Sequence, residues 1–115
     1  MDYLEINGGK RLHGEVTIGG AKNAALPIIA ATLLSDAPTT VSNLPDVDDI
    51  RTLLKLLEML GSRVTYDDHV AHIDNGAIHS HKAVYEIVAQ MRASILVLGP
   101  LLARFGECEV SLPGG

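Results

Sequence analysis

Residues 46–73 decide the fold of this chain, and they read DVDDIRTLLKLLEMLGSRVTYDDHVAHI. From residue 47 to residue 60 the apolar side chains recur at helical spacing, which predicts an amphipathic helix. Asp46 is the expected N-cap, and two further aspartates follow in the first turn, where the helix dipole favours negative charge. Gly61 is the expected stop, because glycine readily adopts the left-handed conformation that ends helices.

Short runs on either side of this helix have the character of strands. Residues 63–66 and 69–73 alternate around two aspartates, which predicts a hairpin. Residues 39–44 form a run rich in β-branched side chains before the helix, and residues 107–112 form another near the end of the sequence. We therefore expect four strands in this part of the chain.

Two more segments are typical of buried helices. Residues 21–34 are rich in Ala, Leu and Ile, and the regular helix is expected to begin between Asn23 and Pro27, since proline is tolerated in a first turn. Residues 83–103 form a second helical stretch. A Gly-Pro pair at residues 99–100 should kink or divide it.

The opening of the chain predicts one more hairpin, and the elements together predict the class of fold. Residues 3–6 and 12–18 have strand character on either side of an Asn-Gly-Gly turn. From residue 12 the order is then β-α-β-α-β-β, with another helix and strand after it. Strands alternating with helices predict an α/β protein whose helices are layered on a sheet.

Composition excludes several classes of protein. The 115 residues carry 9 basic and 14 acidic side chains, a net charge of −5, which has the wrong sign for binding nucleic acid through the overall field. Apolar runs are far shorter than the roughly 20 residues that span a bilayer, so we expect no membrane insertion. The chain has one cysteine, and its N-terminus lacks a signal-peptide pattern. We expect a cytoplasmic protein with an aliphatic core.

The segment GGAKN, residues 19–23, is the first candidate for chemistry, because it joins an expected strand to an expected helix. Small residues let backbone N–H groups approach an anion, the helix N-terminus is partly positive, and Lys22 adds a full charge. The alternative is structural: the glycines make a tight turn, Asn23 caps the helix and Lys22 is solvated.

Other polar residues give weaker signals. Arg92 interrupts an apolar stretch and needs a partner, which is either a phosphate or carboxylate ligand or an acidic side chain of the protein. The five histidines lack the spacing of a metal site, so no metal ligand is assigned. Cys108 stands between two glutamates that should raise the pKa of its thiol, and it is expected to be structural.

Four motifs carry a resemblance to a known family. They are GGAKNAALP at residues 19–27, MRAS at 91–94, LGPLLARFG at 98–106 and SLPGG at 111–115. In this order and spacing the sequence resembles the UDP-N-acetylglucosamine enolpyruvyl transferases, the bacterial enzymes that begin peptidoglycan precursor synthesis. The resemblance runs the whole length of the chain, but those enzymes are several times longer.

The resemblance implies an activity and a set of site residues. The family transfers the enolpyruvyl group of phosphoenolpyruvate to the 3-hydroxyl of UDP-N-acetylglucosamine and needs no cofactor. Lys22 matches the family's catalytic and substrate-contacting lysine, Asn23 its asparagine neighbour in the site, and Arg92 a substrate-site arginine. The shikimate-pathway enolpyruvyl transferases share the fold but typically have serine after the lysine. A non-catalytic paralogue or interaction module of the same fold is the other alternative.

The resemblance also implies an arrangement of domains. Residues 1–20 would be a strand pair that packs with a C-terminal domain of the full-length protein, and residues 21–115 would be the first part of the catalytic N-terminal domain. The chain would then hold about one and a half of the family's β-α-β-α-β-β units. The family's general acid, usually a cysteine, follows the Pro-Gly-Gly with which the sequence stops, so these residues alone are expected to be inactive.

Overall fold

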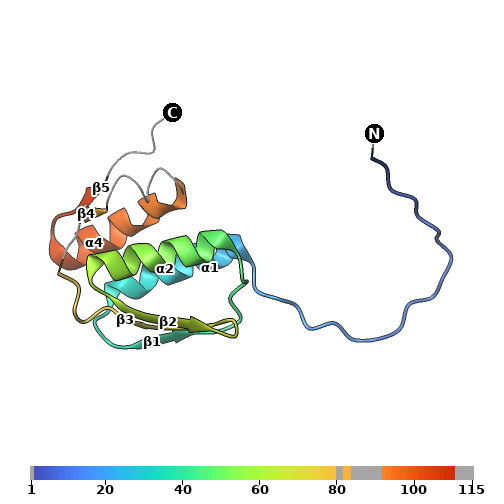
Figure 1. Ribbon diagram of the computed structural model, residues 1–115, viewed down its shortest axis with the longest axis horizontal. Coiled ribbons are helices and arrows are strands. Elements are labelled where there is room, and N and C mark those ends of the chain that lie inside the picture. The colour runs from blue at the N-terminus through green and yellow to red at the C-terminus, as the bar shows by residue number, and fades with distance from the viewer. Residues whose placement is uncertain (1, 80–81, 84–91, 111–115) are drawn as a thin grey trace.

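The computed structural model describes residues 2–79, 82–83 and 92–110, and within them it has the expected mixed α/β character (Figure 1). The elements in chain order are α1 (Lys22–Ala31), the 3₁₀ turn η1 (Thr32–Leu34), β1 (Thr39–Val41), α2 (Asp48–Leu60), β2 (Arg63–Asp67), β3 (Val70–Asp74), β4 (Lys82–Ala83), the 3₁₀ segment η2 (Arg92–Val97), α4 (Leu98–Phe105) and β5 (Glu109–Val110).

β1, β3 and β2 form an antiparallel sheet in that spatial order. The predicted hairpin is confirmed: β2 and β3 pair from Arg63 opposite Asp74 to Asp67 opposite Val70. Both outer strands are antiparallel to β3, so they run parallel to each other and are joined by the crossover helix α2. β4 and β5 form a separate parallel pair.

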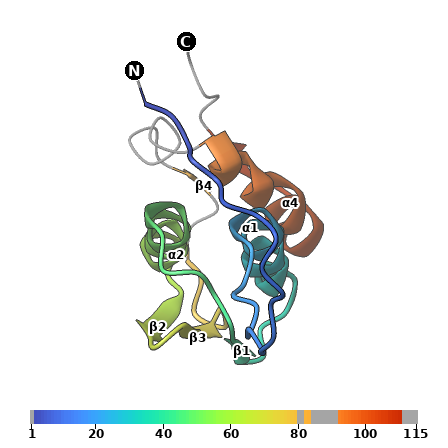
Figure 2. The same ribbon diagram turned by 90° about the vertical axis from the view of Figure 1, so that its right-hand side faces the viewer.

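The helices cover one face of the three-stranded sheet (Figure 2). Side chains alternate across its strands: Ala71 and Ile73 of β3 are buried under the helices, while His72 points to the other face. α1 and α2 lie side by side above the sheet, and α4 lies beyond α1 (Figures 1 and 2). The core between these layers is aliphatic, as the composition predicted, and includes Ile29, Leu33, Ile50, Leu53, Leu56, Leu57, Leu60 and Leu101.

One buried polar network ties three elements together within this core. The Asn75 side chain is fully buried just after β3, and its amide donates to Thr32 Oγ1 at 3.1 Å. The hydroxyl of Ser62, before β2, donates to Asn75 Oδ1, and the hydroxyl of Thr32 donates to the carbonyl of Ile29 at 2.6 Å. Each buried polar side chain therefore has a partner, which avoids the cost of an unpaired polar group.

The prediction for α2 is confirmed except for the residue that forms its N-cap. Gly61 ends the helix in the left-handed conformation at φ 117°. A Cβ at this position would lie 2.8 Å from the carbonyl oxygen of Ala77, so crowding adds to the conformational need for glycine. The expectation that Asp46 caps the helix is wrong. The N-cap is Val47, and the Asp46 carboxylate turns to the guanidinium of Arg51 instead.

α1 begins at Lys22, five residues before Pro27, so the expected start between Asn23 and Pro27 is at least one residue too late and proline lies inside the helix. Proline removes the hydrogen bond to the carbonyl four residues earlier, that of Asn23. Both residues are on the exposed side of α1, where water can hydrate that carbonyl. Asn23 is not the cap, because that position belongs to Ala21.

The predicted hairpin at the start of the chain is wrong for this structure. Residues 2–20 contain no strand and leave the body as an extended arm (Figure 1). A compact domain of this length has a radius of gyration of about 13 Å, whereas the observed value of 17.8 Å reflects the arm. An isolated two-stranded hairpin is marginal in water, and no other described residues cover the apolar side chains of this one.

The last described segment follows its prediction in outline, except that Ala83, the expected first residue of the helical stretch, lies in strand β4. The helical stretch is divided, with η2 ending at Val97 and α4 placing the Gly-Pro pair in its first turn. The guanidinium of Arg104 donates to the carbonyl of Leu33 at 3.2 Å and thereby ties the end of α4 to η1. The predicted strand at residues 107–112 is β5, Glu109–Val110. Residues 84–91 and 111–112 lie outside the described part of the chain.

Candidate functional site

The candidate site lies where α1 and α2 begin, at the right-hand end of the body in Figure 1. Lys22 is the first residue of α1 and Asn23 the second. Ala21 precedes them in extended conformation and provides no side-chain cap. First-turn N–H groups of a helix have no partner within the helix, so this end presents donors and partial positive charge beside the lysine.

Gly20 fixes how the chain enters α1. A Cβ placed on it would lie 1.7 Å from the carbonyl oxygen of Asn43, so the Gly20 backbone rests directly against the loop that follows β1. No side chain fits at this position, so it requires glycine. The contact also ties the bend before Lys22 to a segment that is distant in sequence. A hollow of about 210 Å³ adjoins this contact, lined by both segments and by Ala24 and Ile28.

Lys22 forms an ion pair that sequence reasoning missed. Its Nζ lies 2.9 Å from the Asp49 carboxylate, in the first turn of α2. The two side chains are 46% and 41% exposed, so the pair is at the surface and accessible from solvent. The structure therefore matches neither a fully solvated lysine nor one left unpaired for an anion. From the sequence, Asp49 was expected only to interact favourably with the helix dipole. No sequence pattern indicates that it lies close to Lys22.

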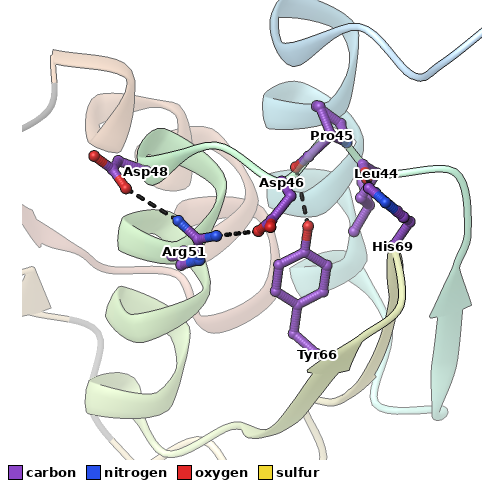
Figure 3. Close-up of polar contacts among 7 residues, drawn as sticks. All are labelled: Leu44, Pro45, Asp46, Asp48, Arg51, Tyr66 and His69. Carbon is purple, nitrogen blue, oxygen red and sulfur yellow. Dashed lines mark hydrogen bonds and ion pairs between the residues drawn. The ribbon is translucent and has the colours of Figure 1, made fainter.

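The loop that leads into α2 is held by the β2–β3 hairpin (Figure 3). The Leu44 N–H donates to the carbonyl of His69 at 2.9 Å, and His69 Nδ1 lies 2.7 Å from the carbonyl oxygen of Leu44. Because a carbonyl only accepts, Nδ1 carries the proton of this imidazole. The Tyr66 hydroxyl donates to the carbonyl of Pro45 at 2.9 Å. Three hydrogen bonds thus fix two consecutive residues of the loop.

Charges around this loop also act on Tyr66. Burial raises the pKa of its phenol above the usual 10.0, the Asp46 carboxylate raises it further, and the Arg51 guanidinium lowers it. Arg51 bridges Asp46 and Asp48, with 3.0 Å from Nη1 to the Asp48 carboxylate (Figure 3). This bridge joins the loop to the first turn of α2. The neutral tyrosine is the form that donates to the loop.

Arg92 is the third residue expected in the site. It is the first residue of η2, which packs beside α1, but its side chain lies outside the described part of the structure. Its role in the site therefore stays a prediction. Lys22 and Asn23 are adjacent at one helix end, and the residue that the fold brings to them from another element is Asp49.

The remaining candidates do not extend the site. Burial raises the pKa of the Cys108 thiol, which confirms the expected direction, although the cause is burial and not the neighbouring glutamates. Among the described residues no group of His, Cys, Asp and Glu is arranged to hold a metal ion, and no helix there is long and apolar enough to cross a bilayer. A hollow of about 470 Å³ lined by Thr40, Thr65 and His72 shares no residue with the α1 end.

Comparison with known proteins connects this chain to one family. The sequence pattern of EPSP synthase (3-phosphoshikimate 1-carboxyvinyltransferase) matches residues 6–115. A protein of Sulfurovum sp. (strain NBC37-1) named UDP-N-acetylglucosamine 1-carboxyvinyltransferase is 74% identical over the whole of this chain. A protein of the same name from Wolinella succinogenes is 61% identical, also over the whole chain. The chain spans 27% and 28% of the lengths of these two relatives.

A solved structure supports the fold. The enolpyruvyl transferase NikO from Streptomyces tendae superposes on 86% of this chain with a TM-score of 0.72 at 27% sequence identity. The aligned part is 23% of the NikO chain. The layered arrangement of helices and sheet described above is therefore the enolpyruvyl transferase fold, in part.

Proposed function

Because this chain belongs to the EPSP synthase (3-phosphoshikimate 1-carboxyvinyltransferase) family, we propose that it is the N-terminal part of a UDP-N-acetylglucosamine 1-carboxyvinyltransferase. The observation that carries the proposal is 74% identity, over every residue of the chain, to a relative of that name. The whole enzyme would act in the cytoplasm, at the first committed step of peptidoglycan synthesis, and so would serve cell-wall growth, cell shape and division.

The proposed reaction joins two anionic substrates. The sugar's 3-hydroxyl loses its proton as its oxygen bonds to C2 of phosphoenolpyruvate, and the methylene carbon gains a proton, which gives a tetrahedral adduct. Loss of phosphate together with a proton from the new methyl group then forms the enol ether. These steps need an acid, a base and cations that hold the phosphate and carboxylate. The described residues supply a cation.

Lys22 is the proposed catalytic cation, with Asn23 and Arg92 as substrate-binding residues. In support, the Lys22 side chain is 46% exposed beside the uncapped first turn of α1, where an anion meets both N–H donors and a full positive charge. Asn23 follows directly in the same turn. No cofactor or metal is needed for this chemistry.

The shikimate-pathway enzyme is the second candidate, because the family takes its name from it. Asn23 favours the amino-sugar enzyme, since the shikimate enzymes typically have serine at the matching position. The names of the Sulfurovum and Wolinella succinogenes relatives point the same way.

We further propose that residues 1–20 pack against a C-terminal domain of the same protein, while residues 21–115 begin the catalytic N-terminal domain. Along the arm, Leu4 and Ile6, and then Leu12, Val16 and Ile18, recur on alternate positions and are 76–91% exposed. Alternation of this kind suits strands with one face against a hydrophobic layer. The rest of its own chain is thus the expected partner.

The test uses the full-length protein that contains this chain. We expect phosphate release from phosphoenolpyruvate that depends on UDP-N-acetylglucosamine and not on 3-phosphoshikimate. Phosphate release that depends on 3-phosphoshikimate and not on UDP-N-acetylglucosamine would favour the second candidate. No phosphate release with either substrate would support the non-catalytic alternative.

Replacement of the proposed cation tests the site directly. Lys22→Ala should lower kcat/KM for phosphoenolpyruvate by at least about tenfold, equivalent to about 1.4 kcal/mol of transition-state stabilisation. Lys55 in α2 is also exposed and offers the matched control Lys55→Ala, with no expected loss. Steady-state kinetics of both variants measure the difference, and wild-type kinetics in the Lys22 variant would contradict the assignment.

A further inference from the structure

We propose that Asp49 is a positioning residue for this reaction: its carboxylate holds the Lys22 ammonium at the start of α1, where an anionic substrate meets it. The inference rests on the proposed function, because Lys22 is taken as the cation that binds phosphoenolpyruvate. It adds a residue from a second element, α2, to that site.

The ion pair restricts a flexible side chain. A lysine has four rotatable bonds and loses up to about 2 kcal/mol of rotamer entropy when it is fixed. The 2.9 Å contact with Asp49 favours one position of Nζ before any ligand arrives. An ammonium has three N–H donors, so two remain for a phosphate or carboxylate after one is given to Asp49. The substrate then meets a cation that already favours the position in which it binds.

Asp49 can act in this way because the start of α2 is itself held. Tyr66 and His69 fix the loop before the helix through its carbonyl groups, and Arg51, within α2, pairs with Asp46 of that loop. Asp49 lies in the first turn of α2, directly after this loop. The neighbouring Asp48 differs, since its side chain is 97% exposed and pairs with Arg51.

Charge alone would argue against a carboxylate at this place. A negative group next to Lys22 weakens the attraction of the site for an anionic substrate. Replacing Asp49 with neutral asparagine would therefore strengthen substrate capture if net charge decided the matter. If the position of the ammonium decides it, the same replacement weakens catalysis, because a misplaced cation stabilises the transition state poorly. The two accounts predict opposite signs.

The experiment compares Asp49→Asn with Asp48→Asn in the full-length protein. Both changes remove one carboxylate from the same turn of α2, but the first alone removes the partner of Lys22. We expect kcat/KM for phosphoenolpyruvate to fall about tenfold in Asp49→Asn and to stay within about twofold in Asp48→Asn. KM for UDP-N-acetylglucosamine should stay within about twofold in both.

A double-mutant cycle tells positioning from a general effect on folding. If Asp49 acts through Lys22, Asp49→Asn should cost little further activity in a Lys22→Ala background. Thermal unfolding should change little in Asp49→Asn, because a first-turn carboxylate contributes only about 0.3–1 kcal/mol through the helix dipole. If its Tm falls by several degrees, Asp49→Ser, which keeps a residue type favoured at helix starts, takes its place in the same cycle.

Equal effects of the two asparagine variants, additive losses in the cycle, or a gain in kcat/KM would overturn the role of Asp49. Each of these can occur with an active wild-type enzyme, so the proposed function would then stand. An inactive wild-type protein would instead count against the proposed function and against this inference with it.

Discussion

Gly20 shows how closely the bend before α1 is packed. An added Cβ would lie 1.7 Å from the Asn43 carbonyl oxygen, whereas one on Gly19 would meet nothing within 4 Å. Gly20→Ala should therefore lower the free energy of unfolding by about 1–3 kcal/mol or more, because the backbone must move apart. Gly19→Ala is the matched control and should differ from wild type by less than about 0.5 kcal/mol. Urea denaturation of both variants measures the difference, and equal values would mean that the contact is absent.

Single residues also show where sequence reasoning stopped. Lys22 and Asn23 could be predicted because a glycine-rich bend before a helix is a local pattern, and the family motif includes both. The pairing of Lys22 with Asp49 could not, since it depends on how two helices are placed side by side. The same limit applies to Asp46, which fits an N-cap by position but is drawn to Arg51 by charge. An N-cap side chain contributes about 1 kcal/mol and an exposed ion pair up to about 1 kcal/mol, so position in the sequence does not decide between the two roles.

The β2–β3 hairpin and the loop before α2 should be coupled through Tyr66. Its hydroxyl donates to the Pro45 carbonyl, and Tyr66→Phe should cost about 0.5–1.5 kcal/mol of folding stability at neutral pH. Because the folded state raises the pKa of this phenol above 10.0, the hydroxyl's contribution is complete below that pH and is lost as pH rises through the raised value.

The difference in stability between wild type and Tyr66→Phe should therefore shrink above pH 10, and unfolding curves at a series of pH values measure it. Tyr3→Phe serves as the control, since Tyr3 is 82% exposed and should show no difference at any pH. A gap between wild type and Tyr66→Phe that stays constant across the alkaline range would exclude the hydrogen bond to Pro45 as its source.

Among the elements, those that depend on local pattern were predicted well. α2 and the β2–β3 hairpin follow from spacing within a few residues, and both are confirmed. The hairpin expected at residues 3–6 and 12–18 is absent from this structure, because its strands need a layer that the neighbouring sequence does not supply. α1 starts one residue earlier than expected and contains Pro27; the burial of Leu26 and Ile29 on either side of that proline helps to offset the cost of the lost hydrogen bond.

The extended arm at the start of the chain is the part of the molecule that tests the domain proposal. If residues 1–20 pack against another domain, Leu12→Asp should destabilise the full-length protein by at least about 2 kcal/mol, although Leu12 is 91% exposed here. Thr17 lies at the alternate position of the same run, so Thr17→Asp should stay within about 0.5 kcal/mol of wild type. Thermal unfolding of the two variants would decide it, and equal melting temperatures would leave the arm without the proposed contact.

The position of β3 has a consequence for synthesis on the ribosome. β3 is the middle strand of its sheet but the last of the three to be translated. Until residue 74 has left the exit tunnel, β1 and β2 have no shared neighbour. The side of α2 that faces the sheet also stays exposed to water. A nascent chain that pauses before that point would display two unpaired strand edges, the feature that recruits chaperones or starts aggregation.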